Sequence, residues 1–129
     1  MCKTNNKYRS FVTNEGGKNV LYLQLLKALY GCVQSALLWY TLFSTTLKDM
    51  GFELNPYDPC IANKIIDDKQ CTILWYVDDS KISHANPTVV TKIIEAIEEK
   101  FGKMTATRGW EHTFLGMQST FLENKTVKI

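Results

Sequence analysis

The chain has 129 residues, of which 45% are hydrophobic, and a formal net charge of +2. This length suits one domain or part of one, and the apolar fraction is sufficient for a core. The charge is too small to predict nucleic-acid binding from bulk electrostatics, so phosphate contacts would have to come from local lysines and arginines. The sequence has no signal peptide and no run of about 18 apolar residues, which argues against export and against a membrane span.

The cysteines offer no metal site by their spacing. None is separated from another by the two residues typical of zinc ligands, so we interpret all of them as buried or free thiols. They are Cys2, Cys32, Cys60 and Cys71.

The first half of the chain predicts one strand and one helix. Residues 1–20 are polar and contain Gly16-Gly17, so we expect a poorly ordered lead-in that ends in a hairpin-like turn. Alternating β-formers predict a short strand over Val20–Leu25. A stripe of leucines and aromatic residues predicts a helix over Val33–Met50, which Gly51 ends.

The second half alternates strands and helices. Three strands are predicted first, over Cys60–Ile66, Cys71–Val77 and Ser80–His84, with a hairpin between the first two. Asn86-Pro87 predicts the start of a helix that ends at Gly102. Two further strands are predicted around residues 102–107 and 113–121. The pattern predicts an α+β fold with mostly antiparallel connections.

Two adjacent carboxylates, Asp78 and Asp79, directly follow the apolar segment Cys71–Val77. The predicted strands place the pair as the two-residue turn of a hairpin. A strand that buries Ile, Leu and Trp does not need two negative charges at its tip, and such charges repel each other unless water or cations screen them. Carboxylates are ligands that Mg²⁺ prefers, so the pair predicts a two-metal site for phosphoryl transfer. The alternative is a solvated turn, as we interpret Asp67-Asp68.

Four sequence blocks occur in a specific order. They are Lys27-Ala28-Leu29-Tyr30-Gly31 with Gln34 and Trp39-Tyr40; Gly51-Phe52 with Asp58-Pro59-Cys60; Tyr76-Val77-Asp78-Asp79; and Phe114-Leu115-Gly116-Met117. Together these blocks resemble the reverse transcriptase domain of copia-type long-terminal-repeat retrotransposons, over roughly residues 21–118. Y-V-D-D alone is a weak signal, but four ordered blocks are specific and favour the catalytic interpretation of the acidic pair.

The resemblance implies a polymerase palm over residues 21–129, which is a small antiparallel sheet backed by helices. It implies an RNA-directed DNA polymerase that uses Mg²⁺ or Mn²⁺, an RNA or DNA template with a primer, and deoxynucleoside triphosphates. Asp78 resembles the family's principal metal ligand, and Asp79 resembles the supporting carboxylate. The resemblance further implies that Gln34 contacts the incoming nucleotide or the template, that Gly31 permits close approach of the backbone, and that Tyr76 lies near the primer terminus.

The other aromatic and histidine positions are interpreted as structural. We expect Trp39 and Tyr40 to pack between helix and sheet, and the Phe114–Met117 block to pack as an ordinary strand. His84 and His112 are interpreted as surface residues without a ligand cluster.

The chain departs from the family in two respects. The family's first catalytic Asp lies on an upstream strand, and no segment before Lys27 resembles it, so we expect an N-terminally truncated palm that is inactive alone. Where the family usually has Pro and Arg after the Gln, this chain has Ala36 and Leu37. The alternative is a non-catalytic nucleic-acid-binding or interaction remnant, with phosphate contacts from Lys27, Lys81, Lys92, Lys103 and Arg108. A third alternative is a pseudogene product that folds poorly. We expect no membrane partner, a cytoplasmic or retroelement-particle location, and a polyprotein context if the gene is longer.

Overall fold

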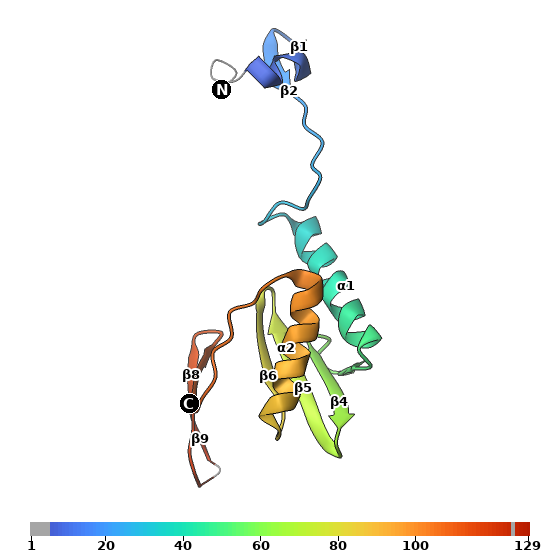
Figure 1. The fold of residues 1–129 in the computed structure, drawn as a ribbon. Coiled ribbons are helices and arrows are strands. Elements are labelled where there is room, and N and C mark those ends of the chain that lie inside the picture. Colours follow the sequence, from blue (N-terminus) through green and yellow to red (C-terminus); the bar gives the residue numbers. More distant parts are fainter. Residues whose placement is uncertain (1–5, 125) are drawn as a thin grey trace. The chain divides into compact units, whose positions relative to one another are not determined.

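The computed structural model describes residues 6–124 and 126–129, and it divides into two compact units between Leu38 and Trp39. Figure 1 shows the helices and strands of both units. Cys2 lies outside the described residues. Among the described residues, no helix is long and apolar enough to cross a membrane.

The first unit contains a short 3-10 helix, η1 (Asn6–Phe11), and a hairpin of β1 (Val12–Glu15) and β2 (Lys18–Leu21). Gly16 and Gly17 form its turn with φ values of +56° and +77°, a conformation that glycine adopts without steric cost. The hairpin-like turn predicted at Gly16-Gly17 is confirmed, and residues 6–20 contain regular structure where we expected a poorly ordered lead-in. The strand predicted over Val20–Leu25 is wrong beyond Leu21, because residues 22–25 are exposed and pair with no strand in the part of the chain that the structure describes.

Helix α1 (Val33–Asp49) confirms the predicted helix to within one residue. Its C-terminal half buries Phe43 and Leu47 in the core of the second unit. Gly51, at φ +82°, ends the helix: its N–H donates to the Lys48 carbonyl, while the Phe52 N–H donates to the Leu47 carbonyl. This pair of bonds is a Schellman motif, in which the glycine takes the left-handed position.

The central sheet has four antiparallel strands in the order β3-β4-β5-β6. They are β3 (Glu53–Leu54), β4 (Ile61–Ile66), β5 (Lys69–Tyr76) and β6 (Asp79–Ser83). The three strands predicted here are confirmed to within two residues at each end, and the two-residue β3 was not predicted. Figure 1 shows helix α2 (Pro87–Phe101) lying across this sheet. The fold is mixed α+β, as predicted.

The core follows the period-two alternation of β5. Cys71, Ile73 and Trp75 are buried, whereas the residues between them are more exposed. Ile73 pairs with Ala62 on β4 and with Ile82 on β6, so the three strands present their apolar side chains to one face. Buried residues of both helices complete this core: Phe43, Leu47, Val89, Ile93 and Ile97.

Helix α2 begins and ends where the sequence predicted. The Asn86 side chain accepts a hydrogen bond from the Thr88 N–H at 2.9 Å, which satisfies one of the free donors of the first turn, and Pro87 occupies the first helical position. At the other end, the Gly102 N–H donates to the Glu98 carbonyl at 2.8 Å, with Gly102 at φ +91°.

The C-terminal part differs from the prediction. It forms a separate sheet of β7 (Glu111–Phe114), β8 (Met117–Phe121) and β9 (Val127–Lys128). The strand predicted around 102–107 is wrong, because this segment pairs with no strand among the described residues. The strand predicted over 113–121 is also wrong, because a turn at Leu115-Gly116, with φ values of +52° and +76°, folds it into a hairpin.

Candidate functional site

The acidic pair lies at the hairpin between β5 and β6, one residue out of the predicted register. The two-residue turn is Val77-Asp78, and Asp79 is the first residue of β6, where it pairs with Tyr76. The prediction that Asp78 and Asp79 together form the turn is therefore wrong. The strand tip nevertheless carries both carboxylates next to each other, and both residues are exposed.

Val77 has a backbone φ of +55°. A β-branched residue rarely adopts the left-handed region, and the steric cost is roughly 1–2 kcal/mol. Such outliers persist only where the surrounding structure holds them, and they cluster at functional sites. The backbone conformation of this turn therefore costs conformational free energy at its first position, Val77.

The second acidic dipeptide, Asp67-Asp68, offers a comparison inside the same sheet. These residues form the turn between β4 and β5, with φ values of +51° and +56°. Asp tolerates the left-handed region better than most residues, so turn geometry alone explains both acids there. At the other hairpin the positive φ falls on Val77, so neither Asp78 nor Asp79 supplies the left-handed conformation of that turn.

A hydrogen bond ties the strained turn to helix α1. The Trp39 indole N–H donates to the Val77 carbonyl oxygen. Trp39 stacks on Phe43, with ring centroids 5.6 Å apart and 16° between the planes, and meets the Phe101 ring edge-on at 5.2 Å. Trp39 thus packs against the core as expected, but its contact with the acidic turn was not predicted.

Both carboxylate residues border one small pocket of about 130 Å³. Trp39 and Phe43 of α1, Trp75 of β5, and Phe101 at the end of α2 form its aromatic wall, and residues 102–104 close it. Asp78 and Asp79 therefore lie at the rim of a pocket that these aromatic residues also line.

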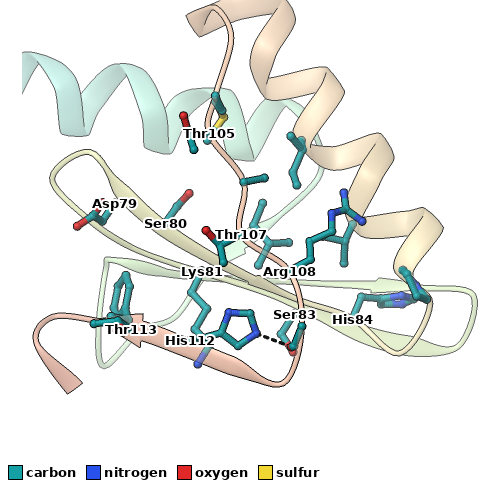
Figure 2. Close-up of a pocket in the computed structure, with 18 of the residues that line it drawn as sticks. Asp79, Ser80, Lys81, Ser83, His84, Thr105, Thr107, Arg108, His112 and Thr113 are labelled. Atoms are coloured by element: carbon teal, nitrogen blue, oxygen red, sulfur yellow. Dashed lines mark hydrogen bonds between the residues drawn. The ribbon is translucent and has the colours of Figure 1, made fainter. Parts of the chain in front are cut away.

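A larger groove of about 660 Å³ runs along β6, and we name it the β6 groove. Residues 79–84 line one side of it, and α2, the segment 104–110 and strands β7 and β8 line the rest. Figure 2 shows Asp79 and Lys81 along β6, with Thr107 and Arg108 on the neighbouring segment. Lys81 Nζ lies 5.1 Å from the centre of the Phe121 ring, a distance at which a cation is attracted to an aromatic face.

The other predicted site residues are exposed. Tyr76, 58% exposed, is the last residue of β5 and pairs with Asp79. Gln34 lies in the first turn of α1, in the first unit, and Gly31 precedes that helix with φ +88°. A side chain at Gly31 would meet no other atom within 4 Å, so the positive φ is the local reason for glycine there.

We expected both histidines to be surface residues without a ligand cluster, and both are partly buried with a ring nitrogen near a backbone carbonyl oxygen. His84 is half-buried, with its Nε2 atom 3.1 Å from the Ile66 carbonyl oxygen. His112 is half-buried too, with its Nε2 atom 2.9 Å from the Gly109 carbonyl oxygen and its ring edge-on to Phe121. Each histidine ring thus contacts the backbone of another segment or turn.

The described cysteines are free thiols. Burial raises the pKa of the Cys71 thiol, and Lys64 opposes this effect. Burial also raises the pKa of Cys60, and the nearby charge of Asp58 adds to it. A raised pKa keeps both thiols neutral, which disfavours nucleophilic or metal-ligating roles.

The fit to a metal can be judged from the donor set. Two exposed carboxylates on one hairpin supply the oxygen ligands that Mg²⁺ and Mn²⁺ prefer. Within residues 6–124 and 126–129, however, no three His, Cys, Asp or Glu side chains are grouped so that they could hold a metal ion. Asp78 and Asp79 thus fit a divalent cation by the chemistry of their oxygens, and the described residues supply no third ligand beside them.

The chain matches a known protein family. A family model described as reverse transcriptase (RNA-dependent DNA polymerase) matches residues 8–127. The chain belongs to this reverse transcriptase family. The match agrees with the copia-type resemblance of the sequence blocks, and it includes residues 8–20, ahead of the predicted palm region. No solved structure gives a significant match to the chain.

Sequence reasoning missed Trp39 as a partner of the acidic turn. The available signal was the indole N–H, because a Trp in a packed environment usually finds a hydrogen-bond acceptor. The identity of that acceptor depends on how α1 packs on the β5–β6 hairpin, 38 residues further along the chain.

Proposed function

We propose that this chain is part of the palm domain of a copia-type RNA-directed DNA polymerase. We further propose that Asp78 and Asp79 hold the divalent metal ions of nucleotidyl transfer. The contrast between the two acidic dipeptides carries the proposal. Asp67 and Asp68 provide the positive φ angles of their own turn, whereas Val77 takes that conformation next to Asp78. The second pair is maintained at a conformational cost, which favours a role for the carboxylates beyond turn formation.

The proposed substrates are a primed template and a deoxynucleoside triphosphate. Asp78 is assigned as the principal metal ligand and Asp79 as the supporting carboxylate. Magnesium or manganese, when bound, lowers the pKa of the primer 3′-hydroxyl and neutralises the charge of the leaving pyrophosphate. The chain's own contribution is to hold two carboxylates on a short hairpin whose strands are anchored in the core.

The proposal also includes a third carboxylate. β6 lies at the end of the strand order β3-β4-β5-β6, so no described strand pairs with its outer edge. Asp79 begins this open edge, and the β6 groove runs along it. In the family, the first catalytic Asp lies on an upstream strand that joins the acidic pair, and we propose that such a strand pairs here.

The roles implied for Gln34 and Tyr76 remain part of the proposal. Both side chains are exposed, as contacts with an incoming nucleotide and a primer terminus require. Gly31, just before the Gln34 helix, adopts a backbone conformation that a larger residue would adopt at a cost.

Primer extension tests the proposed activity. With Mg²⁺ or Mn²⁺ we expect the 129-residue chain alone to give no template-dependent DNA synthesis, because two carboxylates leave the metal ions under-coordinated. A longer chain that adds the family's upstream Asp strand is expected to extend the primer and to lose extension on Asp78→Asn. Extension by the 129-residue chain alone would contradict the proposed need for the third carboxylate.

A second candidate function is nucleic-acid binding without chemistry. It is supported by two cations, Lys81 and Arg108, that line the β6 groove together with one carboxylate, Asp79. Binding to an RNA–DNA hybrid should then weaken as salt rises, because binding releases counterions from the phosphates and this release is less favourable at high salt. Binding that is unaffected by a double Asp78→Asn, Asp79→Asn variant, together with no polymerase activity in the longer chain, would favour this candidate.

A further inference from the structure

Trp39 connects three elements behind the acidic turn. The residue comes from α1, stacks on Phe43 of the same helix, and meets Phe101 at the end of α2 edge-on. Contacts on two sides restrict the indole ring, and the ring is only partly exposed. From this position its N–H donates to the Val77 carbonyl oxygen at the β5–β6 hairpin.

The accepting oxygen belongs to the peptide unit that joins Val77 to Asp78. A peptide unit is planar, so a hydrogen bond to its oxygen restricts the orientation of the whole plane, including the Asp78 N–H. The backbone at Asp78 sets the direction of its Cα–Cβ bond, from which the carboxylate extends. The indole therefore limits where the Asp78 carboxylate points.

The turn needs such an external contact. Val77 adopts a φ of +55°, which a β-branched residue does not favour, and its side chain is 46% exposed, so packing of that side chain holds the turn only in part. The other end of the turn is closed by the Tyr76–Asp79 strand pair. The hydrogen bond from the Trp39 indole acts on the peptide between Val77 and Asp78, inside the turn that the Tyr76–Asp79 pair closes.

We propose that Trp39 is a positioning residue for Asp78, acting through the Val77 carbonyl. A catalytic role for Trp39 rests on the proposed metal-binding role of Asp78. The effect of the indole on the conformation of the turn is independent of that role. Trp39 touches neither metal nor substrate in this account, and its role is to select one conformation of a strained hairpin.

The test compares Trp39→Phe, which keeps an aromatic ring and removes the donor, with Phe43→Leu, which weakens the stack and keeps the donor. NMR measures the HN–Hα coupling of Val77, which reports φ, and the amide exchange of Asp79 relative to that of Ile73 in the core. Trp39→Phe should raise the Asp79/Ile73 exchange ratio about five- to tenfold, the effect of one lost hydrogen bond. It should also move the Val77 coupling away from its left-handed value.

Phe43→Leu is expected to accelerate exchange throughout the core while the ratio stays within about twofold of the parent chain. A benzothienyl analogue at Trp39 keeps the size of the ring and lacks only the N–H, so it covers the case in which Trp39→Phe fails to fold. If the exchange ratio and the Val77 coupling are unchanged in a folded Trp39 variant, the inference is wrong.

The metal role is read out separately. Mn²⁺ added to the parent chain should broaden the Asp78 amide selectively, and the half-saturating Mn²⁺ concentration should rise about fivefold or more in Trp39→Phe. A changed exchange ratio without selective broadening in the parent chain would overturn the metal assignment and support the positioning effect. Selective broadening with no change in exchange, coupling or Mn²⁺ affinity would overturn the positioning effect alone.

Discussion

Replacing Val77 with glycine should barely change stability, although the substitution removes a β-branched residue from a hairpin. The φ of +55° costs the parent chain roughly 1–2 kcal/mol, and glycine adopts this conformation freely. Two losses oppose that gain. Glycine adds roughly 0.5–1 kcal/mol of backbone entropy to the unfolded state. The Val77 side chain is 46% exposed, so about half of its burial, roughly 1 kcal/mol, is lost.

These terms nearly cancel, so Val77→Gly should change the free energy of unfolding by less than about 1 kcal/mol. Ile65→Gly is the matched control. Ile65 lies within β4, is 66% exposed, and has no positive φ to relieve. This variant should lose about 1–2 kcal/mol from entropy and contacts together.

Urea unfolding followed by circular dichroism measures both variants. The reasoning about strain is refuted if Val77→Gly loses as much stability as Ile65→Gly or more, because no conformational cost would then have been relieved. The same experiment addresses the expectation of a poorly folded product, since it requires a cooperative transition of the parent chain.

Three further predictions concern the second unit. Ile73→Ala should cost about 2–5 kcal/mol in urea unfolding, because this fully buried side chain joins three strands. Asn86→Ala should cost about 1 kcal/mol through loss of the cap on the Thr88 N–H, and Asn86→Ser should restore most of it. Burial raises the pKa of the Cys71 thiol above its usual value of 9.0, so its stabilising contribution is complete below pH 9 and is lost as pH rises through the folded-state pKa. Cys71→Ala should flatten this fall in a series of melts from pH 7 to 10.5, and an identical slope in both chains would contradict the assignment.

The elements of the second unit were largely predictable, because local signals and packing agree there. Asn86-Pro87 and Gly102 bound α2, whereas α1 was located by its apolar stripe and by Gly51 at its end. The alternation of buried residues along β5 likewise matches its period-two pattern. Where local and tertiary preferences coincide, sequence reasoning reaches the correct element.

The errors have a different physical origin. The turn at Leu115-Gly116 places a leucine in the left-handed region, a choice that no local propensity favours. The β5–β6 turn was predicted at Asp78-Asp79 but lies one residue earlier, at Val77-Asp78. The sequence did not indicate this, because a valine is not expected at a positive φ. Segment 102–107 and residues 22–25 have strand-like residues but no described partner strand, and pairing depends on the rest of the fold rather than on local sequence.

The central claim is that Asp78 and Asp79 bind divalent metal ions, and Mn²⁺ titration of acidic-pair variants tests it most directly. Paramagnetic broadening should be strongest at residues 77–80 and should disappear in Asp78→Asn, Asp79→Asn, whereas Asp67→Asn, Asp68→Asn should leave it unchanged. Equal broadening at both acidic dipeptides, or persistence in the first variant, would contradict the account.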